Sequence, residues 1–118
     1  MPAYDLASFK NSRVYGRKAT TTAETDGMNV ATNAGPPTLI VAANVDRTYL
    51  TVENNHGTDT MRYGYATAGV PPTLAFLLSD GMVLVAGAVA ADLETPEAVY
   101  AISTTINTIP ITIDKGQG

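Results

Sequence analysis

The stretch "DRTYLTVENNHGTDTMRYGY", residues 46–65, decides the fold because two alternating runs flank a polar loop. Leu50 and Val52 alternate with polar residues in the first run, and apolar residues recur at every second position in the second. An alternation with period two indicates β-strands that bury one face. Residues 54–59 between the runs are residues that favour turns. We therefore predict a β-hairpin with Leu50 and Val52 facing inward and a polar tip.

Four further stretches after residue 37 have strand character: 38–43, 82–86, 98–103 and 108–114. The stretch "MVLVA" at 82–86 is apolar at every position, which is typical of a central strand. Pro110 has no amide hydrogen to donate, so its strand should lie at a sheet edge or turn that position away from its neighbour. Six or seven short strands separated by turn residues predict a small antiparallel β-sandwich or barrel, with Ile102 and Ile111 also facing inward.

The composition fits one domain of this kind. The chain has 118 residues, 45% of them hydrophobic, and no cysteine, which excludes disulfides and cysteine-bound metals. It contains no apolar run long enough to cross a bilayer. The start, "MPAYDLASFK", carries charges where a signal peptide needs apolar residues. We expect synthesis in a host cytoplasm and no membrane partner.

Residues 1–36 differ from the rest in charge and in apolar content. They carry a net charge of +1, whereas residues 37–118 carry three basic and eight acidic residues, a net charge of −5. The stretch from Arg17 to Pro36 offers only Met28 and Val30 as sizeable core formers. We therefore predict an extended N-terminal arm, residues 1–36, and a β body, residues 37–118, with direct nucleic-acid binding disfavoured by the acidic body.

The arm is either an unordered tail or a segment that becomes ordered on a neighbouring subunit. The second interpretation rests on apolar and basic side chains that a solvated tail does not need. We predict that the following residues bind a partner: Leu6, Phe9, Arg13, Val14, Tyr15, Arg17 and Lys18.

His56 is the only histidine, and Asp59 is the nearest acid after it. A hydrolase would also need a nucleophile, but no serine lies in a G-x-S-x-G sequence. We predict no catalytic residue in this chain. As part of an exposed turn, His56 should be replaceable by alanine at a cost of no more than about 0.5 kcal/mol.

Metal, nucleotide and sugar sites receive little support. No phosphate-binding glycine motif occurs, so we predict no cofactor. Asp92, Glu94 and Glu97 could offer oxygens to calcium, but they follow no known loop pattern, and we predict a solvated acidic turn and no metal. Tyr63 and Tyr65 share one strand face, which favours packing over a sugar-binding platform.

Two arginines fall on the strands of the predicted hairpin. Arg47 lies on the first strand and Arg62 on the second. A surface ion pair with Glu53 or Asp59 is the simplest interpretation of either side chain.

The order of these motifs resembles small β-sandwich virion proteins of tailed bacteriophages. The pattern N-x-x-R-x-x-L-x-V-x-N-N is followed by a polar turn, Y-G-Y, a glycine before an apolar strand, and "AVYAIST". The residues that carry the resemblance are Asn44, Arg47, Leu50, Val52, Asn54, Asn55, Tyr63, Gly64, Tyr65, Gly81 and residues 98–104. The sequence departs from the pattern at "LLSDGMVL", where a proline-glycine turn is expected.

The resemblance implies a structural protein of the virion. We expect a decoration or cement protein that binds assembled major capsid protein at the capsid surface, as a homotrimer, and stabilises the shell. The alternative is a head or tail fibre module that recognises a glycan on the host surface. Copy number separates the two, because a decoration protein covers the whole shell and a fibre is present in few copies.

Overall fold

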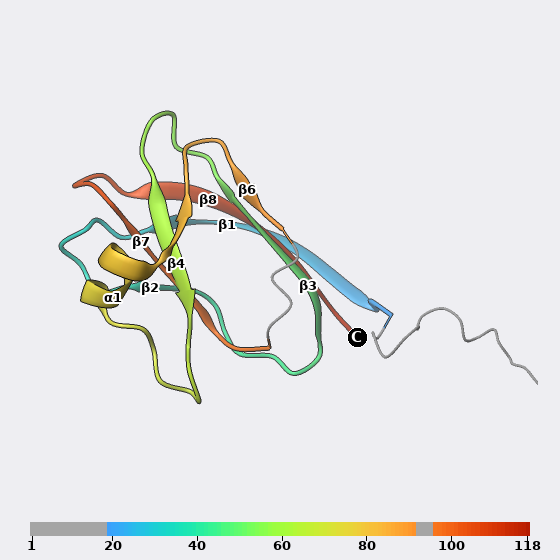
Figure 1. Cartoon of the computed structure of the whole chain (residues 1–118). Coiled ribbons are helices and arrows are strands. Elements are labelled where there is room, and N and C mark those ends of the chain that lie inside the picture. The colour runs from blue at the N-terminus through green and yellow to red at the C-terminus, as the bar shows by residue number, and fades with distance from the viewer. Residues whose placement is uncertain (1–18, 92–95) are drawn as a thin grey trace, which may run out of the picture.

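The computed structural model describes residues 19–91 and 96–118, which form two packed β-sheets and one short helix (Figure 1). The predicted small all-β sandwich is confirmed. The elements in chain order are β1 (Thr22–Val30), β2 (Thr38–Val41), β3 (Arg47–Asn54), β4 (Met61–Tyr65), α1 (Leu74–Asp80), β5 (Met82–Leu84), β6 (Val89–Ala90), β7 (Val99–Ser103) and β8 (Ile109–Gln117).

Each sheet has four strands, and every pairing between neighbours is antiparallel. Sheet A has the order β1-β8-β3-β6, and sheet B has the order β2-β7-β4-β5. The core lies between them. Its buried side chains are Val30, Ile40, Val41, Leu50, Val52, Met61, Tyr63, Leu84, Val99, Ala101, Ile109, Ile111 and Ile113.

Strand β3 confirms the predicted alternation. Leu50 and Val52 are buried, and Thr51 and Glu53 on the opposite face are partly exposed. The alternation continues at both ends, where Thr48 and Asn54 are buried polar residues. The period-two pattern therefore extends beyond the apolar residues that revealed it.

The predicted hairpin between residues 46 and 65 is wrong. Strand β3 pairs with β8 and β6 in sheet A, whereas β4 pairs with β7 and β5 in sheet B. Residues 55–60 thus cross from one sheet to the other. Alternation reports which face of a strand is buried and does not report its pairing partner.

Strand β1 corrects the border of the predicted arm. It lies within residues 1–36, yet it pairs with β8 over its whole length, from Thr22 opposite Gln117 to Val30 opposite Ile109. Only Val30 is fully buried and Met28 half-buried. Strand β1 buries little apolar surface, so it is held in place mainly by its main-chain pairing with β8. The arm as predicted therefore ends before Thr22, and residues 1–18, with all seven predicted partner-binding residues, lie outside the described residues.

The central position expected for the stretch 82–86 is wrong, and so is the edge position, one of the two alternatives for the strand with Pro110. The apolar stretch 82–86 forms no central strand, because β5 is the last strand of sheet B. Strand β8 with Pro110 is central, between β1 and β3. The Pro110 carbonyl accepts a hydrogen bond from the Asn55 amide, 2.8 Å away, beyond the last β3–β8 pair at Asn54 and Ile111. The missing donor therefore faces the place where the β3 ladder ends.

Helix α1 covers the outer face of sheet B. The Thr73 hydroxyl caps the helix by accepting the Phe76 amide at 3.1 Å. Leu77 is fully buried over β4, where a Cβ at Gly64 would lie 2.9 Å from its Cδ2. Ile102 is buried as predicted, but it lies on this outer face, since its neighbours Ala101 and Ser103 point into the sandwich. Within the described ranges, no helix is long and apolar enough to cross a membrane.

Candidate functional site

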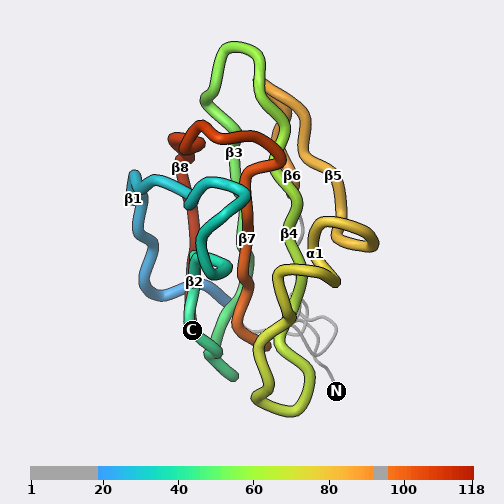
Figure 2. Tube along the Cα trace, turned by 90° about the vertical axis from the view of Figure 1, so that its left-hand side faces the viewer, coloured from blue at the N-terminus to red at the C-terminus, as the bar shows by residue number. Residues whose placement is uncertain are grey.

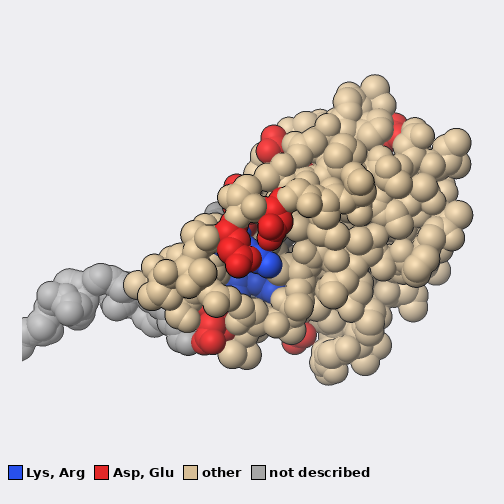
Figure 3. All heavy atoms as spheres, turned by 180° about the vertical axis from the view of Figure 1, so that it is seen from behind, with Lys and Arg blue, Asp and Glu red and all other residues tan. Residues whose placement is uncertain are grey.

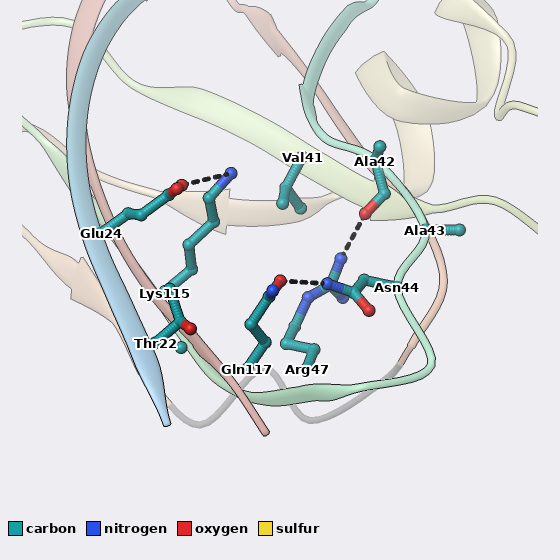
Figure 4. Close-up of a pocket in the computed structure, with 10 residues that line it drawn as sticks. Thr22, Glu24, Val41, Ala42, Ala43, Asn44, Arg47, Lys115 and Gln117 are labelled. Atoms are coloured by element: carbon teal, nitrogen blue, oxygen red, sulfur yellow. Dashed lines mark hydrogen bonds and ion pairs between the residues drawn. The ribbon is translucent and has the colours of Figure 1, made fainter. Parts of the chain in front are cut away.

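One end of the sandwich opens into a polar cavity of about 130 Å³ (Figure 4). Sheet A lines it with the ends of β1 and β8, and sheet B with the segment that follows β2. Lys115 Nζ lies 3.5 Å from Glu24 Oε1, and Asn44 Nδ2 donates to Gln117 Oε1 over 2.8 Å. Figure 3 shows the blue basic atoms beside red acidic ones at one place, on a face that is mostly uncharged. Lys115 and Glu24 thus form an ion pair in this cavity, and Asn44 and Gln117 form a hydrogen bond.

Arg47 joins the two sheets at this end. Its guanidinium donates to the Ala42 carbonyl at 2.6 Å and to the Glu97 carbonyl at 3.0 Å, one after β2 and the other before β7. Partial burial lowers the pKa of Arg47, and the neighbouring Tyr65 opposes that shift. Arg62 donates to the Gly81 carbonyl at 3.1 Å. Both arginines therefore hold main-chain carbonyls, which sequence patterns do not reveal.

The loop with His56 is fixed by its own hydrogen bonds. His56 Nδ1 accepts the amides of Thr58 and Asp59 at 3.1 and 2.9 Å. Asn54, fully buried, donates to the Asp59 and Leu84 carbonyls at 3.0 Å each and accepts the His56 amide. The loop is therefore an ordered connection between the sheets, and His56 is one of its hydrogen-bonding residues.

Asp59 connects this loop to the turn between β7 and β8. Its Oδ2 accepts hydrogen bonds of 2.8 Å from both Asn107 Nδ2 and Thr105 Oγ1. These bonds, first that of Asn107, lower the pKa of Asp59 below its usual value of 3.8. Asp59 thus serves as an acceptor that joins two loops.

This geometry offers no nucleophile to His56. In the part of the chain that the structure describes, no serine hydroxyl bonds to His56: Ser103 is fully buried beside Thr105, and Ser79 donates to the Ala75 carbonyl. Because Nδ1 already accepts two amides, a base would have to act through Nε2, which lies 3.6 Å from Asp59 Oδ2. The arrangement suits loop closure better than proton transfer.

Asp92 and Glu94 of the predicted acidic turn lie outside the described residues. Glu97 is described, and its carbonyl accepts from Arg47. Among residues 19–91 and 96–118, no three potential metal ligands cluster together.

Tyr63 and Tyr65 pack on the inner face of sheet B. Their rings form an edge-to-face pair with centroids 6.4 Å apart, and Tyr63 is only 8% exposed. Burial raises the pKa of both phenols. Two rings turned into the sandwich present no flat surface to a sugar, so this strand face forms packing.

The outer strands β5 and β6 carry an unusual apolar surface. Val83, Val85 and Val89 are each 53% exposed, and we call these three residues the valine edge. No charged residue occurs from residue 81 to 91. The stretch 82–86 was predicted as a central strand, but β5 ends at Leu84. Gly87 follows it with a φ of 76°, a conformation that favours glycine and does not continue a strand.

A groove of about 480 Å³ lies between β4, helix α1 and the segment 67–73. Its apolar walls come from Val70, Pro71, Pro72, Phe76 and Met82, and Asp80 lies at its rim. We call it the β4 groove. It is the larger and more apolar of the two hollows described above.

Comparisons of the chain with profiles of known protein families, with characterised proteins and with solved structures gave no match.

Proposed function

We propose that this protein is a structural protein of a bacteriophage virion that decorates the capsid and stabilises it by binding assembled coat protein. The resemblance of residues 40–114 to phage virion proteins supports this role. The observation that carries the proposal is the valine edge. It consists of three half-exposed valines in a stretch without charged residues, on a protein whose polar groups at the cavity and in the His56 loop form hydrogen bonds and ion pairs.

An exposed apolar edge of this kind favours association with another molecule. Natural sheets protect their outer strands with charged residues, proline or bulges, because a bare apolar edge invites association. Strands β5 and β6 carry none of these, and half of each valine side chain faces water. Val83 lies beside Arg62 on the outer face of sheet B, and Val89 lies beside Glu53 on the outer face of sheet A. Burying all three valines therefore requires a partner that wraps around the β5–β6 edge.

The role needs no chemical step. A protein that binds the assembled shell but not free coat subunits shifts the equilibrium toward the shell by mass action. In this proposal the valine edge contacts the shell surface, and the basic residues of the segment 1–18, Lys10, Arg13, Arg17 and Lys18, reach acidic groups on adjoining subunits. A homotrimer would bring three such surfaces to one site and raise the avidity.

The test is binding of the full chain to capsids of the phage that encodes it, prepared without this protein. Val89→Lys places a charge in the valine edge, next to Glu53 on β3, so the fold itself should tolerate it. Thr51→Lys is the matched control, because it places the same charge on the same sheet next to Asp114.

We expect Val89→Lys to weaken co-sedimentation with capsids at least tenfold, and Thr51→Lys to bind within about twofold of the original chain. Capsids bound by the original chain should withstand a higher temperature than bare ones. Equal binding by the two variants would remove the valine edge from the interface. Absence of any binding to capsids would contradict the proposed function itself.

A further inference from the structure

The β4 groove lies where a strand is missing from sheet B. Strand β5 pairs with Met61–Tyr63 only, the last pair being Tyr63 and Met82, because the chain before Gly81 belongs to helix α1. On its other side β4 is paired with β7 as far as Tyr65. The outer edge of β4 is therefore left without a neighbour strand at Tyr65.

The hydrogen bonds show which way the main chain of Tyr65 points. The Ala66 amide donates to the Ala98 carbonyl at 2.9 Å, and the Thr60 carbonyl accepts the Thr104 amide at 3.0 Å, so positions 60 and 66 face β7. Because strand residues alternate in direction, the amide and carbonyl of Tyr65 face the opposite side. That side is the groove, and neither group has a hydrogen-bond partner among the described residues.

The groove thus matches an extended peptide. The amides of Thr67 and Val70 each donate to the other residue's carbonyl at 2.9 Å. Those main-chain groups are therefore occupied, whereas the amide and the carbonyl of Tyr65 can still bond to an added strand. Beside it stand Val70, 65% exposed, and Phe76, 48% exposed. A strand added here would make two main-chain hydrogen bonds and place an apolar side chain against these residues.

We propose that the occupant is the segment Ser12–Arg17 of a second copy of this chain. Charge favours it: residues 1–18 hold four of the seven basic and one of the eleven acidic residues, so they carry +3 and the remaining chain −7. Within the segment, Val14 and Tyr15 stand between Arg13 and Arg17. The apolar pair suits the groove walls, and an arginine would lie within reach of Asp80 at the rim.

Chain length and direction favour a second copy. The described chain enters β1 at the end of the sandwich away from α1 (Figure 1). Val14 lies five residues before the first described residue and can be at most about 17 Å from it, so a neighbouring molecule would have to bring its β4 groove close to the start of β1. This contact between copies goes beyond the proposed function, because it would form in solution without any capsid.

Disulfide trapping on the full chain tests the proposal. Because the chain has no natural cysteine, only the introduced cysteines can form disulfides. A chain with Val14→Cys is mixed with an affinity-tagged chain with Phe76→Cys in a glutathione redox buffer. The matched control is a tagged chain with Val89→Cys, whose position is apolar and 53% exposed but lies on the valine edge. All three substituted sites avoid the core that the structure describes.

We expect the mixed disulfide of the Phe76→Cys pair to accumulate at least tenfold over that of the Val89→Cys pair. When the Val14→Cys chain also carries Arg13→Glu and Arg17→Glu, the yield of the mixed disulfide with Phe76→Cys should fall at least threefold. Equal yields, or no mixed disulfide at all, would overturn the proposal. A chain carrying both Val14→Cys and Phe76→Cys that closes on itself at high dilution would assign the groove to its own N-terminal segment and overturn the second-copy assignment. The capsid-binding test compares Val89→Lys with Thr51→Lys and uses none of these substitutions, so either proposal can fail without the other.

Discussion

Sheet A ends in two very different edges, which lie on opposite sides of the molecule (Figure 2). On one side β1 runs for nine residues and presents Thr22, Glu24 and Asp26 to solvent. On the other side β6 and the adjoining β5 are two and three residues long and present the valine edge. The long edge is polar and charged, whereas the short edges are apolar and uncharged.

The difference shows that a free strand edge and a binding surface are separate properties. Strand β1 has the longest outer edge of sheet A, but its carboxylates oppose the approach of another strand. The valine edge offers little main chain for pairing, so it can associate only through its side chains. The β1 edge is suited to contact with solvent, and the valine edge is the surface that we propose contacts a partner.

Removing an edge strand should have the largest effect. Deletion of residues 1–36 takes away β1 with Val30 and leaves β8 unpaired on one side, so we expect a loss of stability comparable to the whole free energy of unfolding, about 5 to 15 kcal/mol. We therefore expect that residues 37–118, predicted from the sequence as the β body, do not fold without β1. Thermal unfolding followed by circular dichroism measures it. Deletion of residues 1–18 should leave the transition in place, and a stable fold without residues 1–36 would show that β1 is dispensable.

Matched valines compare the two edges directly. Val30→Ala on β1 removes fully buried carbons and should cost about 2 kcal/mol in the free energy of unfolding. Val89→Ala on β6, half-exposed, should cost less than about 0.5 kcal/mol. Urea denaturation of both variants gives the values. Similar costs would mean that the valine edge is already covered in the isolated protein.

The loop between the sheets lies at neither edge and provides a reference. His56→Ala leaves two amides without their acceptor, so we expect a loss of about 1 kcal/mol, larger than the sequence suggested. Thr58→Ala, in the same loop and exposed, is the control and should change the same free energy by less than half as much. If the two losses are equal, the Nδ1 bonds contribute nothing.

Acid should weaken the same loop. The pKa of Asp59 is lowered in the folded protein, so its contribution to stability is present above the unfolded value of 3.8 and is lost as the pH falls below it. The melting temperature should therefore fall as the pH drops below about 4, and this fall should be smaller in Asp59→Asn. An identical fall in both proteins would assign the acid sensitivity to other carboxylates.

Local patterns predicted the strands but not their partners. Leu50, Val52 and Ile111 were placed correctly because each strand reveals its buried face through alternation. Strand β1 was missed, since its order comes from β8, more than eighty residues away in the chain. The run 82–86 was misplaced because an apolar stretch looks the same in sequence whether its strand lies inside a sheet or at its exposed edge.

The candidate surfaces depended even more on distant contacts. The β4 groove exists because helix α1 replaces the strand that would have continued beyond Met82, and only the fold shows this. The sequence did indicate basic and apolar residues in the segment 1–18, but no local pattern showed what they could bind.

The central place of β8 in sheet A has a consequence for synthesis on the ribosome. Both β1 and β3 pair along β8, which follows the other described strands in the chain. Until residues 109–117 emerge, β1 has no neighbour and β3 has only its two pairs with β6. Folding of sheet A must therefore wait until residues 109–117 have left the ribosome, and until then the nascent chain leaves its apolar strands open to chaperones.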